Sequence, residues 1–159
     1  MLIFTRSLQR RKIIIENTLT PSFQDYLEII LKLSDDDTKV RVTDIAINLN
    51  ISKASVTQAI DTLIGQGYVS KEKYGPVTLT RKGTLEAMKI INIHKVIREF
   101  LIKVLETDSD VADKDACLME HIISPQTIER MISYLEKGRF EISNDLDLKE
   151  TKSFFNRKY

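Results

Sequence analysis

The sequence has few of the residues that stabilise small secreted proteins, and it lacks the long apolar runs of membrane proteins. Its 159 residues include one cysteine, five glycines and three prolines. A single cysteine excludes an internal disulfide, which fits a reducing cytoplasm. No apolar run approaches the roughly 18 residues of a membrane-spanning helix, and the basic N-terminus does not resemble a signal peptide. These absences predict a cytoplasmic protein without a membrane partner.

The charges that are present are balanced in sum but unevenly distributed. The formal net charge is +1, and 42% of the residues are hydrophobic and 30% charged, as in a globular and largely helical protein. Residues 53–83 carry five Lys or Arg against two acidic residues, whereas residues 106–120 carry six acidic residues against one lysine. This order indicates an anionic partner for the first segment and a cation for the second.

The N-terminal half predicts a basic arm followed by a winged-helix domain. Residues 1–19 carry a basic cluster without a clear period, and Thr20 and Pro21 suit the N-cap and first turn of a helix. After it we expect a break at the aspartates of 35–37, a short strand at Val40 and Val42, helices over 43–50 and 53–66, and strands over 68–71 and 77–80. A helix, a helix–turn–helix unit and a hairpin follow the winged-helix order.

The C-terminal half predicts further helices and an unassigned tail. The expected helices cover residues 81–105, 111–122 and 125–137. The first of them carries an apolar stripe in which His94 falls. Residues 139–159 alternate charged and apolar residues without a pattern that predicts an element. The fold class is therefore mainly α, with the winged helix at the N-terminal end.

The third predicted helix has a polar face suited to reading DNA. A helix–turn–helix unit places the start of its second helix in the major groove. The exposed candidates there are Ser52, Lys53, Ser55, Thr57 and Gln58, with Lys71 and Lys73 on the wing for phosphates. Glutamine can bind an adenine edge with two hydrogen bonds, and hydroxyls bind bases or phosphates. The opposite face, with Ala59, Ile60, Leu63 and Ile64, is expected to face the core. A solvated helix face with no DNA role remains the alternative.

A second group of residues suggests a metal site. Residues 115–124, DACLMEHIIS, place the only cysteine, a glutamate and one of the two histidines on one predicted helical face. Each has an ordinary explanation, because a lone cysteine is often a small buried hydrophobe and a lone histidine in an apolar stripe is often a core residue. Together, thiolate, imidazole and carboxylate donors suit a divalent first-row metal. Spacing alone leaves both interpretations open.

Several stretches together resemble the diphtheria-toxin-repressor family of metal-dependent regulators. They are TPSFQDYLEIILKLS, VRVTDIAINLNISKASVTQAIDTLIGQGYVSKEKYGPVTLTRKG, the long helix with His94, and DACLMEHIIS, which span roughly residues 20–137. The resemblance is closest to the short manganese-sensing branch. It implies a homodimer that binds operator DNA and represses manganese- or iron-uptake genes when a divalent transition metal, Mn(II) or Fe(II), is bound. The implied metal ligands are Asp25, Glu28, His94, Cys117, Glu120 and His121.

The resemblance also implies a domain organisation and leaves a mixed ligand set. The implied parts are the arm (1–19), the winged helix (20–83), a linker helix with the metal-binding and dimerisation domain (84–138), and a tail (139–159). Asp25 and Glu28 resemble the manganese-sensing branch, whereas Cys117 resembles the iron-sensing branch. Arg98 and Asp113 stand where iron sensors have ancillary ligands. The chain also ends before the SH3-like third domain of iron sensors, which favours a two-domain manganese-type regulator.

Two other classes of winged-helix protein remain as alternatives. One is a regulator that responds to a small molecule without a metal, and the other is a protein-interaction module that does not bind DNA. An enzyme is not expected, since the sequence contains no phosphate loop. Its Cys and His residues also fit a coordination shell better than a nucleophile with its base. Loss of specific DNA binding in a chelator is expected only for a metal-dependent regulator.

Overall fold

Seven helices and one two-stranded hairpin make up the part of the chain that the computed structural model describes, which is residues 19–34, 39–73, 75–138 and 140–156. The elements are α1 (Pro21–Leu33), α2 (Val42–Leu49), α3 (Lys53–Gly65), β1 (Val69–Lys71), β2 (Val77–Leu79), α4 (Arg81–Leu105), α5 (Ser109–Met119), α6 (Pro125–Lys137) and α7 (Leu148–Asn156). The mainly α fold and its winged helix-turn-helix order are confirmed. The expected arm up to residue 18 and the break at 35–37 lie outside the described residues.

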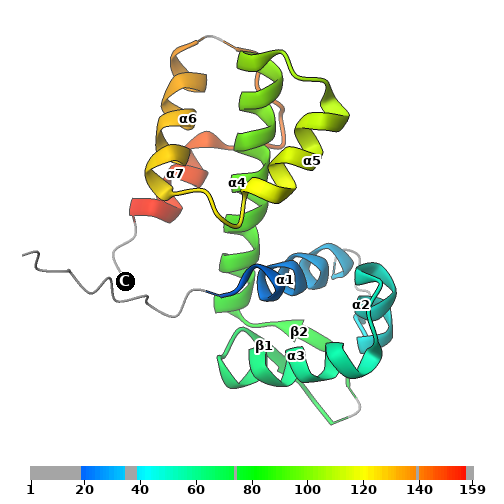
Figure 1. The fold of residues 1–159 in the computed structure, drawn as a ribbon. Coiled ribbons are helices and arrows are strands. Elements are labelled where there is room, and N and C mark those ends of the chain that lie inside the picture. Colours follow the sequence, from blue (N-terminus) through cyan, green and yellow to red (C-terminus); the bar gives the residue numbers. More distant parts are fainter. Residues whose placement is uncertain (1–18, 35–38, 74, 139, 157–159) are drawn as a thin grey trace, which may run out of the picture.

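The long helix α4 connects two groups of elements. Figure 1 shows α1, α2, α3 and the hairpin at the lower end of α4, and α5, α6 and α7 around its upper part. Each group has its own hydrophobic cluster. The first includes Leu27, Ile30, Ile60 and Leu63, and the second includes Ile97, Ile128, Ile132 and Leu135. A fully buried aliphatic side chain stabilises the fold by about 1.5–3 kcal/mol, so each group has an apolar core of its own.

The winged helix follows its local sequence signals. The hydroxyl oxygen of Ser52 accepts a hydrogen bond from the backbone N–H of Ser55 at 3.1 Å and so caps α3. Beyond the end of α3, Gly67 has a φ of +76°, the left-handed conformation that glycine adopts without strain. The hairpin that follows is antiparallel, with Val69 opposite Leu79. Residues 51–55, at the N-terminal end of α3, are all exposed, so this end lies on the outside of the domain.

The start of α4 is fixed tightly against the wing. Thr80 caps it by accepting a hydrogen bond from the N–H of Gly83 at 3.1 Å. A Cβ atom on Gly83 would lie 2.0 Å from the carbonyl oxygen of Tyr68, so only glycine fits this approach. Lys82 lies over the Tyr68 ring, 3.9 Å from its centroid. The winged helix is thus held directly on the helix that carries His94.

The C-terminal segment contains an element that the sequence pattern does not predict. Helix α7 packs against α4 and α6, and Leu146 before it is buried. The Ser143 hydroxyl donates to Glu99 of α4 at 2.6 Å. The ammonium group of Lys95, also on α4, lies 2.9 Å from the carboxylate of Asp145. The described part of the tail is therefore packed along the helix that carries His94.

Four local expectations are corrected. Val40 and Val42 form no strand, because the Asp44 carboxylate accepts the N–H of Arg41 at 2.8 Å and starts α2 at Val42. The side chain of Ile64 is 38% exposed rather than buried. Thr20 occupies the N-cap of α1 without a side-chain capping hydrogen bond. Helix α5 ends at Met119, three residues before the expected end. None of the helices in the described ranges has the length and hydropathy needed to span a bilayer.

Candidate metal centre

The six candidate ligands come from three separate elements. Asp25 and Glu28 lie on α1, and His94 lies on α4. Cys117 lies in the last turns of α5, whereas Glu120 is its C-cap and His121 belongs to the turn that follows. The prediction that the last three share a helical face therefore holds only up to Glu120, whose φ and ψ of −56° and −30° are still helical. This turn directs His121 toward α1.

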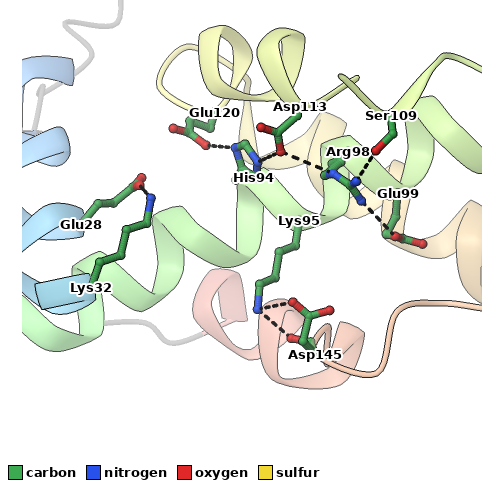
Figure 2. A network of polar contacts seen from close by, with 10 residues as sticks. All are labelled: Glu28, Lys32, His94, Lys95, Arg98, Glu99, Ser109, Asp113, Glu120 and Asp145. Carbon is green, nitrogen blue, oxygen red and sulfur yellow. Dashed lines mark hydrogen bonds and ion pairs between the residues drawn. The ribbon is translucent and has the colours of Figure 1, made fainter. Parts of the chain in front are cut away.

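Glu120 joins both histidines. It is buried, and its Oε2 atom lies 2.7 Å from Nδ1 of His94, while its Oε1 atom lies 3.3 Å from Nε2 of His121. Figure 2 shows the ring of His94 between Glu120 and Asp113, both from the α5 region. The Oδ1 atom of Asp113 lies 3.2 Å from Nε2 of His94. One buried carboxylate thus faces one nitrogen of each of the two imidazole rings.

His121 connects the end of α5 to the winged helix. Its Nε2 atom lies 3.1 Å from Oδ1 of Asp25. Its Nδ1 atom lies 2.7 Å from the amide oxygen Oε1 of Gln24, a residue 97 positions away in the sequence. Both partners are on α1, so the contact joins the two groups of elements. These distances bring Asp25, His94, Glu120 and His121 into one continuous polar cluster.

Glu28 lies at the edge of this cluster with one oxygen unsatisfied. Its Oε2 atom pairs with Lys32, one helical turn further along α1, at 3.3 Å, as Figure 2 shows. Its Oε1 atom is buried and has no hydrogen-bond partner among the described residues. A buried carboxylate oxygen without a partner costs free energy. A cation at this point would remove that penalty.

The pKa values in the cluster reflect crowded, partly buried acids. Burial raises the pKa of Glu28, and the nearby Glu120 raises it further. Burial also raises the pKa of Asp25 and of the Cys117 thiol, and the negative charge of Glu120 adds to both shifts. The hydrogen bond to Glu120 raises the pKa of His94. Asp25, Glu28, Cys117 and His94 therefore hold their protons to higher pH than they would in water, and a metal ion that binds them competes with those protons.

The donor set fits a divalent metal, although the side chains are engaged with one another. Among the described residues, no three His, Cys, Asp or Glu side chains converge as a preformed coordination shell. Instead, the carboxylates and histidines form the pairs described above, and the Cys117 side chain is exposed. Carboxylate, imidazole and thiolate donors are together suited to first-row divalent ions. Glu28 has a buried oxygen without a partner, and it lies close enough to Glu120 for that charge to raise its pKa.

The predicted DNA-reading residues lie on the outer surface of the winged helix. Ser52, Lys53, Ser55, Thr57, Gln58 and Lys73 are exposed, and Lys71 is partly exposed. The hydroxyls of Ser52 and Ser55 lie 2.8 Å apart, and the Thr57 hydroxyl donates to the backbone oxygen of Lys53 at 2.9 Å. Gln58 therefore offers the longest neutral hydrogen-bonding side chain on this surface.

Some polar residues in these regions were not predicted as functional. Gln24 contacts His121, and Asp113 contacts His94. Each pair is far apart in the sequence, so no local sequence pattern predicts the contact. Near the wing, Lys39, Arg41 and Lys71 line an open groove of about 500 Å³ together with the first turn of α2. An excess of basic residues at 39–41 is the only sequence signal for that groove. It provides a positively charged surface between the start of α2 and the wing.

Comparisons with known proteins match both halves of the chain. The model for the iron dependent repressor N-terminal DNA binding domain matches residues 18–77. The model for the iron dependent repressor metal binding and dimerisation domain matches residues 80–144. An uncharacterized HTH-type transcriptional regulator of Methanocaldococcus jannaschii is 38% identical over 125 residues, which are 78% of this chain and 100% of that protein. The HTH-type transcriptional regulator MntR of Shouchella clausii is 30% identical over 138 residues, which are 85% of this chain and 96% of that protein.

A solved structure gives the same result for the fold. The structure of the manganese regulator SloR is similar with a TM-score of 0.64 and 31% sequence identity. The similarity covers 74% of this chain and 55% of SloR, so this chain spans about half the length of that relative.

Proposed function

This chain belongs to the iron-dependent repressor family of metal-dependent, DNA-binding transcriptional regulators, and on that premise we propose that it binds a divalent metal ion between its winged helix and the end of α5. The proposed ligands are Asp25, Glu28, His94, Cys117, Glu120 and His121. A bound divalent cation would neutralise the crowded carboxylates and replace the protons that the cluster holds. The proposed ion is Mn(II) or Fe(II), and the proposed place of action is the cytoplasm, where operator DNA is found.

The observation that carries this proposal is the meeting of α1 with the end of α5. His121 contacts Gln24 and Asp25 across that boundary. Glu28, on the same helix as those two, has a buried oxygen without a partner. The donors thus come from both groups of elements, and their negative charges favour a cation between them. A site of this kind couples cation binding to the relative orientation of the two groups.

That orientation is the proposed basis of regulation. Dimeric helix–turn–helix proteins read two half-sites about 34–36 Å apart, or multiples of that spacing. When the donor groups are not held together, repulsion between Asp25, Glu28 and Glu120 favours many orientations of the winged helix. Only a fraction of those orientations fits an operator, so the apparent affinity for DNA falls by that fraction. By linkage, operator DNA should increase the affinity for the metal by the same factor.

The DNA surface proposed here consists of the N-terminal part of α3 and the wing. Gln58 is proposed to contact a base edge in the major groove, with Ser55 and Thr57 beside it. Lys53, Lys71 and Lys73 are proposed to contact phosphates, and the groove lined by Lys39 and Arg41 extends this basic surface. The charge of these residues supports binding to the backbone of double-stranded DNA.

The outer face of α5 is the proposed dimer interface. Val111, Leu118 and Ile122 recur at helical spacing along the α5 region, and they are 47%, 73% and 79% exposed in the single chain. Large apolar side chains in such a row usually mark a protein–protein contact. The match of residues 80–144 to a dimerisation domain supports a second copy of this chain as the partner.

A metal titration of DNA binding tests the proposed function. Duplexes selected from a random pool by the Mn(II)-loaded protein serve as the probe, and binding is measured with Mn(II), Fe(II), Co(II) and Zn(II) and after chelation. We expect specific binding only with a divalent metal, together with a stoichiometric metal content per chain. Specific binding that survives complete chelation would reject the proposed metal dependence and favour a metal-free regulator.

A further inference from the structure

Each imidazole of the candidate metal centre has one nitrogen that faces the carboxylate cluster and one that faces away from it. Nδ1 of His94 and Nε2 of His121 face the two oxygens of Glu120. Nε2 of His94 faces Asp113 at 3.2 Å, and Nδ1 of His121 faces Gln24 at 2.7 Å. Neither Asp113 nor Gln24 is among the proposed ligands. Both provide an acceptor oxygen on the far side of a ring from Glu120.

We propose that Asp113 and Gln24 are positioning residues that fix which nitrogen of each histidine faces the metal. This inference rests on the proposed function, because it concerns the same site. An imidazole binds a metal through an unprotonated nitrogen and keeps its proton on the other nitrogen. Asp113 accepts the remaining proton of His94 from Nε2, and Gln24 accepts that of His121 from Nδ1. The ligating atoms are then Nδ1 of His94 and Nε2 of His121.

Asp113 is itself held in place by α4. The Arg98 Nε atom lies 3.4 Å from Oδ1 of Asp113, and an Arg98 terminal amino group donates to the Ser109 hydroxyl at 2.6 Å. Figure 2 shows this chain of contacts running from His94 through Asp113 to Arg98 and Ser109. Because Arg98 and His94 are one helical turn apart on α4, the guanidinium group holds the carboxylate beside the imidazole ring. The pair of residues keeps a carboxylate oxygen of Asp113 at Nε2 of His94.

Gln24 has a different role, because it acts from the winged helix. It lies next to Asp25 in the sequence, yet its amide oxygen contacts the opposite nitrogen of the His121 ring. The ring is therefore held from both sides by adjacent residues of α1. An acceptor there sets the ring orientation only when α1 lies against the end of α5. Gln24 thus makes the orientation of His121 depend on the position of the winged helix.

The test combines Zn(II) affinity with the identification of the ligating nitrogens in the full-length protein. Zn(II) is diamagnetic, so long-range ¹H–¹⁵N correlation spectra of the Zn(II)-loaded dimer report which ring nitrogen keeps its proton. We expect protons on Nε2 of His94 and Nδ1 of His121. Asp113→Ala and Gln24→Ala should each weaken Zn(II) binding by roughly 10–100-fold, as for other residues that orient ligating histidines.

Two controls separate orientation from charge and from stability. Asp110→Ala removes a carboxylate from the exposed first turn of α5, the helix that carries Asp113, and should leave Zn(II) affinity within about threefold of wild type. Gln24→Glu keeps an acceptor oxygen at position 24 and should bind Zn(II) more tightly than Gln24→Ala. Thermal unfolding of each apo variant checks that the fold is retained. A destabilised Asp113→Ala is replaced by Asp113→Leu, which fills the space without an acceptor oxygen and should weaken Zn(II) binding to a similar extent.

The outcomes distinguish this inference from the proposed function. Zn(II) coordination through Nε2 of His94 or Nδ1 of His121 would overturn the assignment of the ring nitrogens. Alanine variants at positions 24 and 113 that bind as tightly as Asp110→Ala would overturn the positioning roles alone. Wild-type protein that binds no Zn(II) would overturn the metal site itself, and the positioning roles with it.

Discussion

Nε2 of His121 lies 3.1 Å from Oδ1 of Asp25, and this contact joins the end of α5 to the first helix of the winged helix. Both residues are proposed metal ligands, and they come from the two different groups of elements. Without a cation, the contact is an ion pair when the imidazole is protonated. In the proposed site, the same two residues would hold the cation.

The pH dependence of stability should report the protons held by the cluster. Burial raises the pKa of Asp25 and Glu28, and Glu120 raises that of His94. The apo fold therefore binds more protons at these groups than the unfolded chain, so their contribution to stability falls as pH rises. For the carboxyls the fall begins above their ordinary pKa of about 4, and for His94 above about 6.5.

Glu28→Gln isolates one part of this effect. Glutamine has no proton to lose, so the variant should gain free energy of unfolding relative to the apo wild type as pH rises from about 4 to 8. Urea unfolding at several pH values measures this difference. A difference that stays constant across the range would contradict the raised pKa. The stabilisation of wild type by Mn(II) should instead increase with pH, because fewer protons compete.

The side chain at position 117 should set the ranking of metals. A thiolate is a soft donor that favours Fe(II), Co(II) and Zn(II) over Mn(II). Burial raises the pKa of the Cys117 thiol, so it stays protonated until a metal displaces the proton. Cys117→Glu should improve activation of DNA binding by Mn(II) relative to Fe(II) and Co(II), and it should remove inactivation by peroxide. An unchanged ranking would mean that the thiol is not a ligand.

Two kinds of DNA contact should respond differently to mutation. Gln58→Ala should cost about 1–3 kcal/mol in operator binding and relax the preference at one base pair per half-site. Lys71→Ala should weaken binding to all duplexes alike and reduce the slope of log K against log salt by about 0.9 for each phosphate that the lysine neutralises in wild type. Binding isotherms at several salt concentrations measure both effects. No change in Gln58→Ala would place the recognition surface elsewhere on α3.

The α5 face should control the oligomeric state. Leu118→Asp and Ile122→Asp each place a charge in the proposed interface and remove a large apolar side chain from it, so the dimer dissociation constant should rise at least about 100-fold. Ile47→Asp is a matched control, since Ile47 is 76% exposed on α2, far from α5 in Figure 1. Analytical ultracentrifugation should detect monomers for the first two variants only. A dimer in all three would exclude this face.

Local signals in the sequence predicted much of the fold. Ser52, Thr80 and Ser124 each cap a helix with their own side chain, because the interaction involves a backbone N–H only three residues away. Val40 and Val42 were wrongly assigned to a strand, since β-branched residues favour strands but Asp44 starts a helix at Val42. Helix α7 was missed because its packing against α4 and α6 comes from distant residues.

The candidate site was predicted only in part for the same reason. The resemblance identified Asp25, His94, Glu120 and His121, and the structure brings these four into contact. That they bind a metal remains a prediction. The contacts of Gln24 with His121 and of Asp113 with His94 span 97 and 19 positions. Such contacts depend on how α1 and α5 pack against each other, which no local pattern contains.

The most direct test of the shared metal site is metal-dependent operator binding by Glu28→Ala and His121→Ala. Glu28 lies on α1 and His121 beyond α5, so their only proposed common role is the metal site between the two groups of elements. Each variant is measured with Mn(II) and after chelation, beside circular dichroism and the oligomeric state. Both should remain folded and dimeric and lose the metal-dependent increase in affinity. Either variant responding to Mn(II) as wild type does would contradict a site that α1 shares with the end of α5.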